Sequence, residues 1–340
     1  MKIGIVGASG YSGGELLRII SSHPKFELEY IAASSNAGEF ITSVHPALTL
    51  FSEEKFEETS LEAMKRCELL FFALPHGASS EYIEKLPESI KVVDLGADYR
   101  LEDAAQWSTY YGGSYSGFLP YGLPELPGAR ALIAQSARIA NPGCYATAII
   151  LGALPAISHK IIDATDIVVV AASGTTGAGR SAKINLIASE AANSLTSYKF
   201  GGVHQHTPEI EQSISHVSGS ASRISFTPIL APMPRGILAT ITAKISGALT
   251  TEKVHEIYAG AFESEPFVHV LPLGQMPQTS AVTGSNSVHI QVAVDSHTNR
   301  LIISVAIDNL GKGAASQAVQ NANIMCGFAE TLGLSTQGVR

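Results

Sequence analysis

The chain opens with the stretch Lys2-Ile3-Gly4-Ile5-Val6-Gly7-Ala8-Ser9-Gly10-Tyr11-Ser12-Gly13. Residues 2–6 predict a short apolar strand, and the glycine-rich turn after it leads into a predicted helix over 11–22. Glycines in such a turn permit a tight bend and let a pyrophosphate come close to the helix N-terminus. The spacing G-x-x-G-x-x-G is a variant of the usual G-x-G-x-x-G, and a plain turn is the alternative interpretation. Because the turn follows a strand and opens a helix, we expect it to bind a dinucleotide through Gly7, Ser9, Gly10, Tyr11, Ser12 and Gly13.

Strand and helix patterns alternate through the first third of the chain. Further strands are predicted at 28–33, 69–74 and 91–95, with helices at 60–66 and 81–86 between them. This alternation is typical of an α/β fold with a parallel, doubly wound sheet of the Rossmann type. Residues 110–127 are rich in Gly, Pro and Tyr and predict an ordered loop.

A second α+β domain with different patterning follows. Val-, Ile- and Thr-rich stretches, several of them alternating with period two, predict a mostly antiparallel sheet with strands at 166–172, 223–229, 238–245, 287–294 and 301–306. Residues 313–332 predict a long amphipathic helix that packs back onto the first domain. We therefore expect a dinucleotide-binding domain over 1–146, completed by the C-terminal helix within 313–340. Residues 147–312 would form the catalytic, substrate-binding and oligomerisation domain.

Composition argues against several classes of protein. The 340 residues carry a net charge of −8 with no run of Lys or Arg, so we expect no nucleic-acid partner. The longest apolar runs are the length of strands, and a strand follows Met1 directly, so we expect neither a membrane segment nor a signal peptide. Three widely spaced cysteines argue against a disulfide framework and fit the reducing cytoplasm. We also expect a homo-oligomer, a dimer or a tetramer.

The end of the second predicted strand indicates which dinucleotide binds. An NAD site usually has Asp or Glu there to hold the ribose 2′-hydroxyl, and the sequence Ala33-Ser34-Ser35-Asn36 has neither. Hydroxyl groups suit a 2′-phosphate better, because a carboxylate would repel it. We therefore expect NADP(H) as the cofactor, with contacts from Ser34 and Ser35. A polar loop without a ligand is the alternative.

Cys144 is the candidate nucleophile. The turn Asn141-Pro142-Gly143 places it at or near the start of an apolar helix predicted over 148–157. There the positive end of the helix dipole stabilises a thiolate. The alternative is a buried structural cysteine, which is the interpretation we favour for Cys67 and Cys326.

Two histidines lie directly before another predicted helix start. In His204-Gln205-His206-Thr207-Pro208-Glu209, Thr207 can cap a helix that begins at Pro208, which leaves both histidines exposed for acid–base chemistry. If the segment is extended, both rings point the same way, but only His206 is close enough to Glu209 to be oriented by it. We therefore expect His206 to move the proton and His204 to contact the substrate. A solvated loop is one alternative; a zinc site lacks further ligands at suitable spacing, so we predict no metal.

Two loops resemble anion sites. Ser173-Gly174-Thr175-Thr176-Gly177-Ala178-Gly179-Arg180 offers backbone N–H groups, hydroxyls and a guanidinium, and Pro232-Met233-Pro234-Arg235-Gly236 holds a second arginine in a rigid turn. A fixed arginine favours bidentate binding of carboxylate or phosphate. The alternative is that each arginine pairs with a surface acid.

Together these motifs and Asp308-Asn309-Leu310-Gly311-Lys312-Gly313 resemble the N-acetyl-gamma-glutamyl-phosphate reductase family of arginine biosynthesis, in the same order and over essentially the whole chain. The Asn-Pro-Gly-Cys and His-x-His-x-Pro-Glu blocks separate this family from aspartate-semialdehyde and glyceraldehyde-3-phosphate dehydrogenases. One departure is Ser316, where the family commonly has Gly, which puts close packing of the C-terminal helix on the cofactor in doubt.

The resemblance implies that NADPH reduces an acyl phosphate through a thioester on Cys144, with phosphate released. It implies acid–base and substrate roles for His204 and His206. Cofactor contacts are then expected from Pro75, His76, Gly77, Ser173, Gly174, Asn309 and Gly311. Substrate contacts are expected from Asn141, Arg180, Glu209 and Arg235.

Two other functions remain open. A sister enzyme of lysine biosynthesis reduces an aminoadipyl phosphate carried by an acidic protein, but the net charge of −8 disfavours an acidic partner. A non-catalytic dinucleotide sensor would need the glycine turn but neither Cys144 nor the histidines.

Overall fold

The computed structural model describes residues 1–339, apart from the side chains of Asn185 and Ala188. By its internal contacts the chain divides into two compact units. Unit 1 comprises residues 1–124, 128–142 and 314–334. Unit 2 comprises residues 125–127 and 143–313 together with the C-terminal residues from Ser335.

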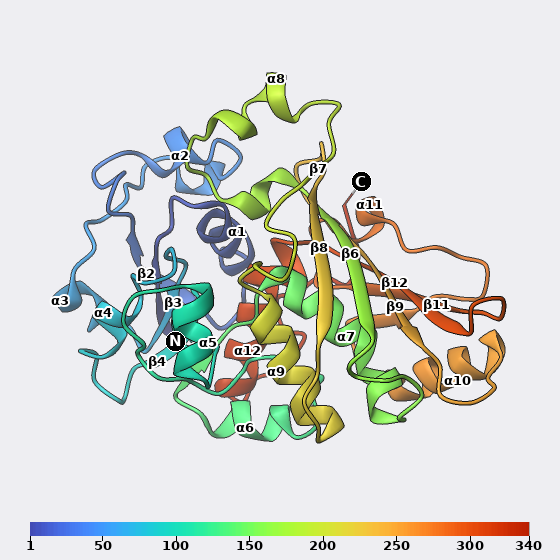
Figure 1. The fold of residues 1–340 in the computed structure, drawn as a ribbon. Coiled ribbons are helices and arrows are strands. Elements are labelled where there is room, and N and C mark those ends of the chain that lie inside the picture. Colours follow the sequence, from blue (N-terminus) through green and yellow to red (C-terminus); the bar gives the residue numbers. More distant parts are fainter. Residues whose placement is uncertain (340) are drawn as a thin grey trace. The chain divides into compact units, whose positions relative to one another are not determined.

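Unit 1 is built on a parallel sheet with the strand order β2-β1-β3-β4-β5 (Figure 1). The strands are β1 (Lys2–Val6), β2 (Glu27–Ala32), β3 (Leu69–Phe72), β4 (Lys91–Asp94) and β5 (Arg138–Ala140). The central strands are runs of buried apolar residues, as expected where helices cover both faces of a parallel sheet. The predicted Rossmann-type sheet is confirmed, although β5 was not among the predicted strands.

Unit 1 also contains short helices, most of which connect these strands. They are α1 (Tyr11–Ile20), α2 (Ile41–Val44), α3 (Leu61–Met64), α4 (Ser80–Ile83), α5 (Ala104–Tyr110), α6 (Ala129–Gln135) and α12 (Ser316–Met325), with a 3₁₀ turn η1 (Thr49–Phe51). The last of them, α12, contacts α6, α1 and β4, so the C-terminal helix belongs to this unit.

The predicted extent of the C-terminal helix, 313–332, is wrong. A π-helical turn, Gly311–Ala315, precedes α12, and the helix ends at Met325. Gly327 follows with φ 69°, the left-handed conformation that commonly stops a helix.

Unit 2 is built on a mixed sheet with the strand order β10-β11-β12-β9-β6-β8-β7. The pairs β6–β8 and β10–β11 are parallel and the others antiparallel, so the mostly antiparallel sheet is confirmed. The strands are β6 (Ile167–Ser173), β7 (Thr196–Ser197), β8 (Ile224–Leu230), β9 (Ile237–Lys244), β10 (Val268–Val270), β11 (Val288–Asp295) and β12 (Arg300–Ile307).

One face of this sheet carries the core of unit 2. The helices α7 (Cys144–Ser158), α9 (Thr207–Ser218) and α10 (Thr251–Ala261) pack there (Figure 1). The residues of α7 from Tyr145 to Ile157 are buried. Side chains along β6 and β9 alternate between buried and exposed, so the opposite face of these strands is open. The remaining elements are the helices α8 (Ala188–Ala191) and α11 (Thr279–Val282) and the 3₁₀ turns η2 (Thr175–Ala178) and η3 (Ile184–Leu186).

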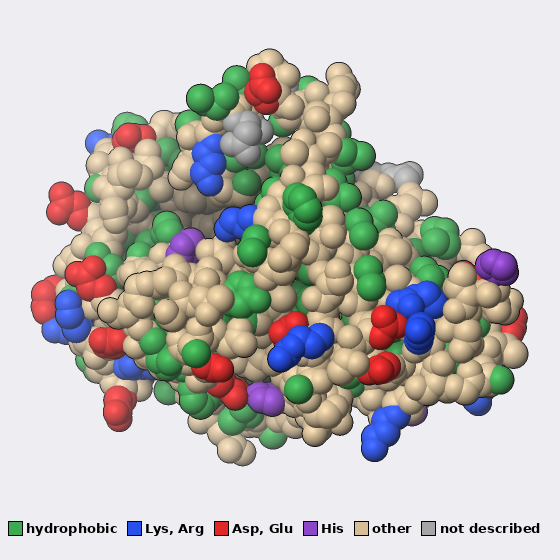
Figure 2. All heavy atoms as spheres, in the orientation of Figure 1, with side chains coloured by type: hydrophobic (Ala, Val, Ile, Leu, Met, Phe, Trp, Pro, Cys, Tyr) green, Lys and Arg blue, Asp and Glu red, His purple; other side chains and the backbone are tan. Residues whose placement is uncertain are grey.

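Within residues 1–339, the helices lack the combination of length and apolar character that a membrane crossing needs. On the face drawn in Figure 2, Lys and Arg side chains are scattered among acidic ones rather than gathered in one basic patch.

Candidate active site

The carboxyl edge of the unit 1 sheet carries the predicted cofactor loops. The strand order reverses between β1 and β3, because the chain leaves β1 for β2 on one side and returns to β3 on the other. Parallel α/β sheets bind ligands at the carboxyl ends of their strands at such a point. Two of the predicted loops follow these two strands: the glycine turn follows β1, and residues Pro75, His76 and Gly77 follow β3.

The three glycines of the first turn differ in their surroundings. A Cβ on Gly7, whose φ is 91°, would lie 2.5 Å from the carbonyl oxygen of Ala73, and one on Gly13 would lie 2.5 Å from that of Gly7. A Cβ on Gly10 would instead meet nothing closer than 3.6 Å. Gly7 and Gly13 are therefore required by the turn and the strand–helix packing, whereas a Cβ at Gly10 would make only an ordinary contact, so packing within the protein does not require glycine there. This arrangement fits a bound pyrophosphate.

Two buried carboxylates hold the loop after β3, and sequence reasoning missed both. Asp98 accepts backbone N–H groups from Gly77 at 2.5 Å and from Ser79 at 3.0 Å. The hydroxyl of Ser79 lies 2.9 Å from both Asp98 Oδ2 and Asp94 Oδ2. Burial, more than the neighbouring Asp98, raises the pKa of Asp94 to about 7. This cluster fixes the backbone on which Pro75 and His76 lie exposed.

Ser34 and Ser35 lie where the 2′-phosphate prediction needs them, just beyond β2 and exposed. The Ser34 hydroxyl lies 3.0 Å from that of Thr59, and Ser35 donates to the side chain of Asn36 at 3.1 Å. Ser9 and Ser12 are half-buried in the glycine turn, and Tyr11 is exposed. Contact of these side chains with a cofactor stays a prediction.

In unit 2, α7 begins at Cys144, as predicted, and the cysteine is partly exposed. The preceding Gly143 donates its backbone N–H to Oε1 of Glu209 at 2.7 Å, and Glu209 is fully buried on α9. This bond joins the starts of α7 and α9. Cys144 therefore lies at the positive end of one helix dipole, in an orientation that a second helix fixes.

The two histidines precede α9 on a turn, not on the extended segment that was predicted. The backbone N–H of Thr207 donates to the carbonyl of His204 at 2.9 Å. Thr207 is itself the first helical residue, so its predicted capping role is wrong. His204 is only 7% exposed, which also contradicts the expectation that both rings are open to solvent.

The turn nevertheless brings both rings together beside Tyr145, the residue that follows Cys144. The ring centres of His204 and His206 lie 4.9 Å apart, and the ring of Tyr145, the residue after Cys144, lies 5.4 Å from His204 and 6.1 Å from His206. Burial, followed by the nearby charges of His206 and Lys199, lowers the pKa of His204 to about 2. His204 is therefore neutral at any physiological pH.

The two loops predicted as anion sites are bonded to each other. Backbone N–H groups of Gly174, Thr175 and Thr176 donate to the carbonyls of Gly236, Met233 and Pro234. The expectation that these N–H groups are available to an anion is therefore wrong. Ser173 is buried and donates to the Gly174 carbonyl, and Arg180 lies exposed at the end of the loop.

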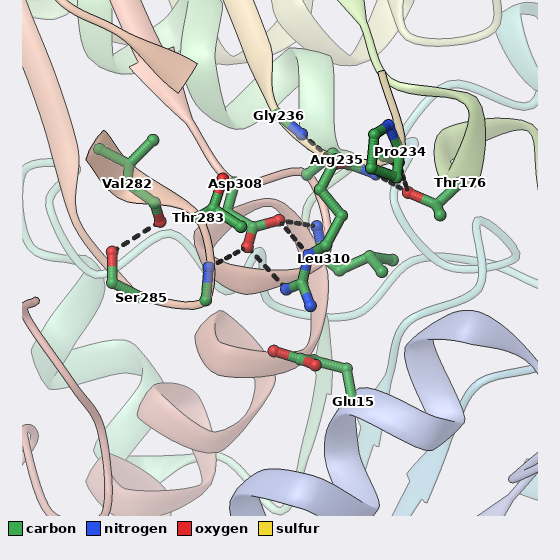
Figure 3. A network of polar contacts seen from close by, with 12 residues as sticks. Glu15, Thr176, Pro234, Arg235, Gly236, Val282, Thr283, Ser285, Asp308 and Leu310 are labelled. Carbon is green, nitrogen blue, oxygen red and sulfur yellow. Dashed lines mark hydrogen bonds and ion pairs between the residues drawn. The ribbon is translucent and has the colours of Figure 1, made fainter. Parts of the chain in front are cut away.

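Arg235 points at a buried acid, not a surface one. Its Nε lies 3.1 Å and its Nη2 2.6 Å from the two carboxylate oxygens of Asp308, which also accept backbone N–H groups from Gly284 and Leu310 (Figure 3). Sequence reasoning gave Asp308 no role, since 73 residues separate the pair. The bidentate pair fixes the guanidinium, and contact with a substrate stays a prediction.

The segment after β12 reaches the cysteine. Asn309 accepts the Gly236 N–H and donates to Thr176, so it ties both loops together. A Cβ on Gly313 would lie 2.8 Å from the Cβ of Cys144. Between them, Gly311 and Lys312 are buried, and Lys312 forms an ion pair with buried Glu125 at 2.6 Å. Unit 2 thus brings together Cys144, the histidines, Glu209 and this segment.

Asn141 has a different environment from the one expected. It is fully buried in unit 1, its Nδ2 donates to the Ala314 carbonyl, and its Oδ1 accepts from Asn321 on α12. These bonds give Asn141 a structural role in anchoring the C-terminal helix. Its predicted contact with substrate has no support from this geometry.

Comparison with known proteins identifies the class that this fold and site represent. Residues 2–135 match the family described as semialdehyde dehydrogenase, NAD binding domain, and residues 144–309 match semialdehyde dehydrogenase, dimerisation domain. Aspartate semialdehyde dehydrogenase II from Vibrio cholerae has a TM-score of 0.72 at 18% identity, over 96% of this chain and 98% of that chain. The enzyme from Candida albicans, solved with NADP, has a TM-score of 0.72 at 17% identity over the same shares. At such identities the likeness shows a common fold.

Full-length relatives define the branch within that class. N-acetyl-gamma-glutamyl-phosphate reductase from Acidothermus cellulolyticus is 54% identical over 99% of this chain and 98% of its own. Proteins of the same name from Salinispora tropica and Frankia casuarinae are 51% and 49% identical over 100% of this chain and 99% of theirs. The chain belongs to the N-acetyl-gamma-glutamyl-phosphate reductase family, which confirms the resemblance seen in its motifs.

Proposed function

We propose that this protein catalyses the NADPH-dependent reduction of N-acetyl-L-glutamyl 5-phosphate to N-acetyl-L-glutamate 5-semialdehyde and phosphate, a step of arginine biosynthesis. Full-length identity with reductases of that name supports the proposal. The structural observation that carries it is the position of Cys144, which opens α7 where Glu209 of α9 binds Gly143 and where two histidines lie beside Tyr145.

The geometry suggests how these residues divide the chemistry. The Cys144 thiolate attacks the acyl carbon, the bond from carbon to the phosphate oxygen breaks, and phosphate leaves a thioester behind. The positive ends of α7 and α9 stabilise the thiolate and the oxyanion that forms. The glycine turn and the loops after β2 and β3 would hold NADPH, whose chemistry would supply the hydride that reduces the thioester.

Proton transfer falls to His206. It donates a proton to the oxygen of the resulting hemithioacetal and takes one back when the carbon–sulfur bond breaks, which releases the aldehyde and restores the thiolate. His204 stays neutral because of its burial, so it contributes a hydrogen bond rather than a proton.

The reverse reaction tests the proposal directly. Purified protein should reduce NADP⁺ when given N-acetyl-L-glutamate 5-semialdehyde and phosphate, and should depend on phosphate for steady turnover. Aspartate semialdehyde, tested in parallel, should support far slower turnover. Equal rates with both aldehydes, or none with the N-acetylated one, would reject the assignment.

We also propose that the protein is a homo-oligomer whose subunits pair through the open face of the unit 2 sheet. Val168, Val170 and Leu238 are 37%, 43% and 36% exposed there, on the paired strands β6 and β9. Apolar side chains gathered on an open sheet are typical of an interface. The match of residues 144–309 to a family described as a dimerisation domain supports pairing through unit 2. Sedimentation should give an oligomer for the wild type and a smaller species for Val170→Glu.

We also propose that the protein is located in the cytoplasm. The three cysteines form no disulfide with one another in the part of the chain described, which suits a reducing compartment. Fractionation of cells that express the protein with its own N-terminus should recover the activity with cytoplasmic markers, and recovery in a secreted fraction would reject this location.

A further inference from the structure

The segment between β7 and the histidine turn has an unusual backbone. Lys199 has φ 43°, in the left-handed region that side chains other than Asn and Asp rarely adopt. Gly201 and Gly202 follow with φ 82° each. The N–H of Tyr198 donates to the Pro228 carbonyl on β8, which anchors the turn just before the lysine. A lysine adopts this backbone conformation only where the surrounding structure holds it there, and such residues cluster at functional sites.

The turn directs Lys199 to the reactive centre. Its Nζ lies 2.8 Å from Oε1 of Gln205, the residue between the two histidines. The hydroxyl of the neighbouring Tyr198 donates a hydrogen bond to the hydroxyl oxygen of Tyr145 at 3.1 Å, and Tyr145 follows Cys144 in the chain. Lys199 is thus tied through its own side chain to the histidine turn and through its neighbour to the start of α7.

The charge of Lys199 lacks a compensating carboxylate. Among residues 1–339, no acid lies within ion-pair distance of either Lys199 or Lys183, whereas Lys2, Lys65, Lys253 and Lys312 each pair with a glutamate. Partial burial and the charge of Lys183 lower the pKa of Lys199, so the two lysines repel each other. An anion bound beside them would relieve this repulsion.

We propose that Lys199, assisted by Lys183, binds an oxyanion of the substrate. This inference rests on the proposed function, under which the substrate has a phosphoryl group at the reacting end and a carboxylate at the other. An ammonium group binds either one as a point charge. The unusual backbone then has a purpose, because it turns the ammonium group back toward the histidines.

Steady-state kinetics in the direction of aldehyde oxidation test the proposal and separate the two anions. Lys199→Met should raise the KM for either phosphate or the semialdehyde by about 10- to 100-fold, with kcat changed far less. This is the range expected for losing a hydrogen bond to a charged group. A rise in the KM for phosphate assigns the phosphoryl group. A rise in the KM for the semialdehyde assigns the carboxylate.

Lys160→Met is the matched control. Lys160 is also exposed, also has a positive φ of 55°, and follows the opposite end of α7 from Cys144. It should leave both KM values unchanged. Lys199→Gly suits the left-handed backbone but removes the charge, so it should behave like Lys199→Met, and Lys199→Arg should recover much of the loss.

Two outcomes would overturn the proposal: wild-type KM values for both anions in Lys199→Met, or an equal effect of Lys160→Met. Failure of the proposed function is recognised separately, since the wild type itself would then not oxidise N-acetyl-L-glutamate 5-semialdehyde.

Discussion

Nδ1 of His204 accepts the backbone N–H of His206 at 3.0 Å. Because Nδ1 is the acceptor, the single proton of the neutral ring must lie on Nε2. His204 is therefore a fixed hydrogen-bond donor, and burial keeps it from titrating. Of the two histidines, only His206 is left to transfer a proton during turnover.

The two histidines should separate in mutant kinetics. His206→Asn should lower kcat by about 10²- to 10⁴-fold, the usual contribution of a general acid or base. His204→Asn should chiefly raise KM, because a neutral donor stabilises the bound substrate and the transition state alike.

The dependence of kcat on pH adds a second readout. The limb in the range where histidines ordinarily titrate, about pH 5 to 8, should disappear in His206→Asn and persist in His204→Asn. The opposite pattern would exchange the two roles, and unchanged kcat in both variants would exclude a histidine shuttle.

Asp94 should make stability depend on pH. Its folded-state pKa of about 7 lies above the ordinary value of 3.8, so the folded state binds more protons between these pH values. The contribution of Asp94 to the free energy of unfolding is thus fully present below about pH 4 and is lost as the pH rises through about 7.

Asp94→Asn removes this titration. The free energy of unfolding of the wild type should fall relative to that of the variant as pH rises from 4 to 7, by at most about 1.4 kcal/mol per pH unit. Urea denaturation at several pH values measures the difference. A constant difference between the two proteins would show that Asp94 has an ordinary pKa.

Cofactor preference should follow from the absence of an acid after β2. The ratio of kcat/KM for NADPH to that for NADH should favour NADPH in the wild type. Ser34→Asp should shift the ratio toward NADH, since a carboxylate repels the 2′-phosphate, and Ser34→Asn serves as the uncharged control. An unchanged ratio in the aspartate variant would place the phosphate elsewhere.

The strands were predictable because their signal is local. Alternating β-branched residues gave β9, β11 and β12 to within one residue of their observed ends. The position of Cys144 followed from the Pro-Gly turn before an apolar helix. The C-terminal helix was predicted to be too long. Gly327 is a sequence signal for the end of a helix, and it was not recognised as one.

Side chains that meet across long separations left no such signal. Asp98 binds a loop about twenty residues earlier through backbone N–H groups, which no sequence pattern reveals. The ion pair of Glu125 with Lys312 joins residues 187 apart. Lys199 was missed because its turn has no motif of its own, and its position depends on how β7 pairs with β8.

The most direct test of the covalent mechanism is a single-turnover experiment without phosphate. Wild-type protein mixed with NADP⁺ and N-acetyl-L-glutamate 5-semialdehyde should produce a burst of NADPH stoichiometric with enzyme, because the thioester forms but has no acceptor. The acyl group should be found on Cys144 by mass spectrometry. Cys144→Ser should give no burst while still binding NADP⁺, and Cys326→Ser should match the wild type. A full burst from Cys144→Ser would contradict the mechanism.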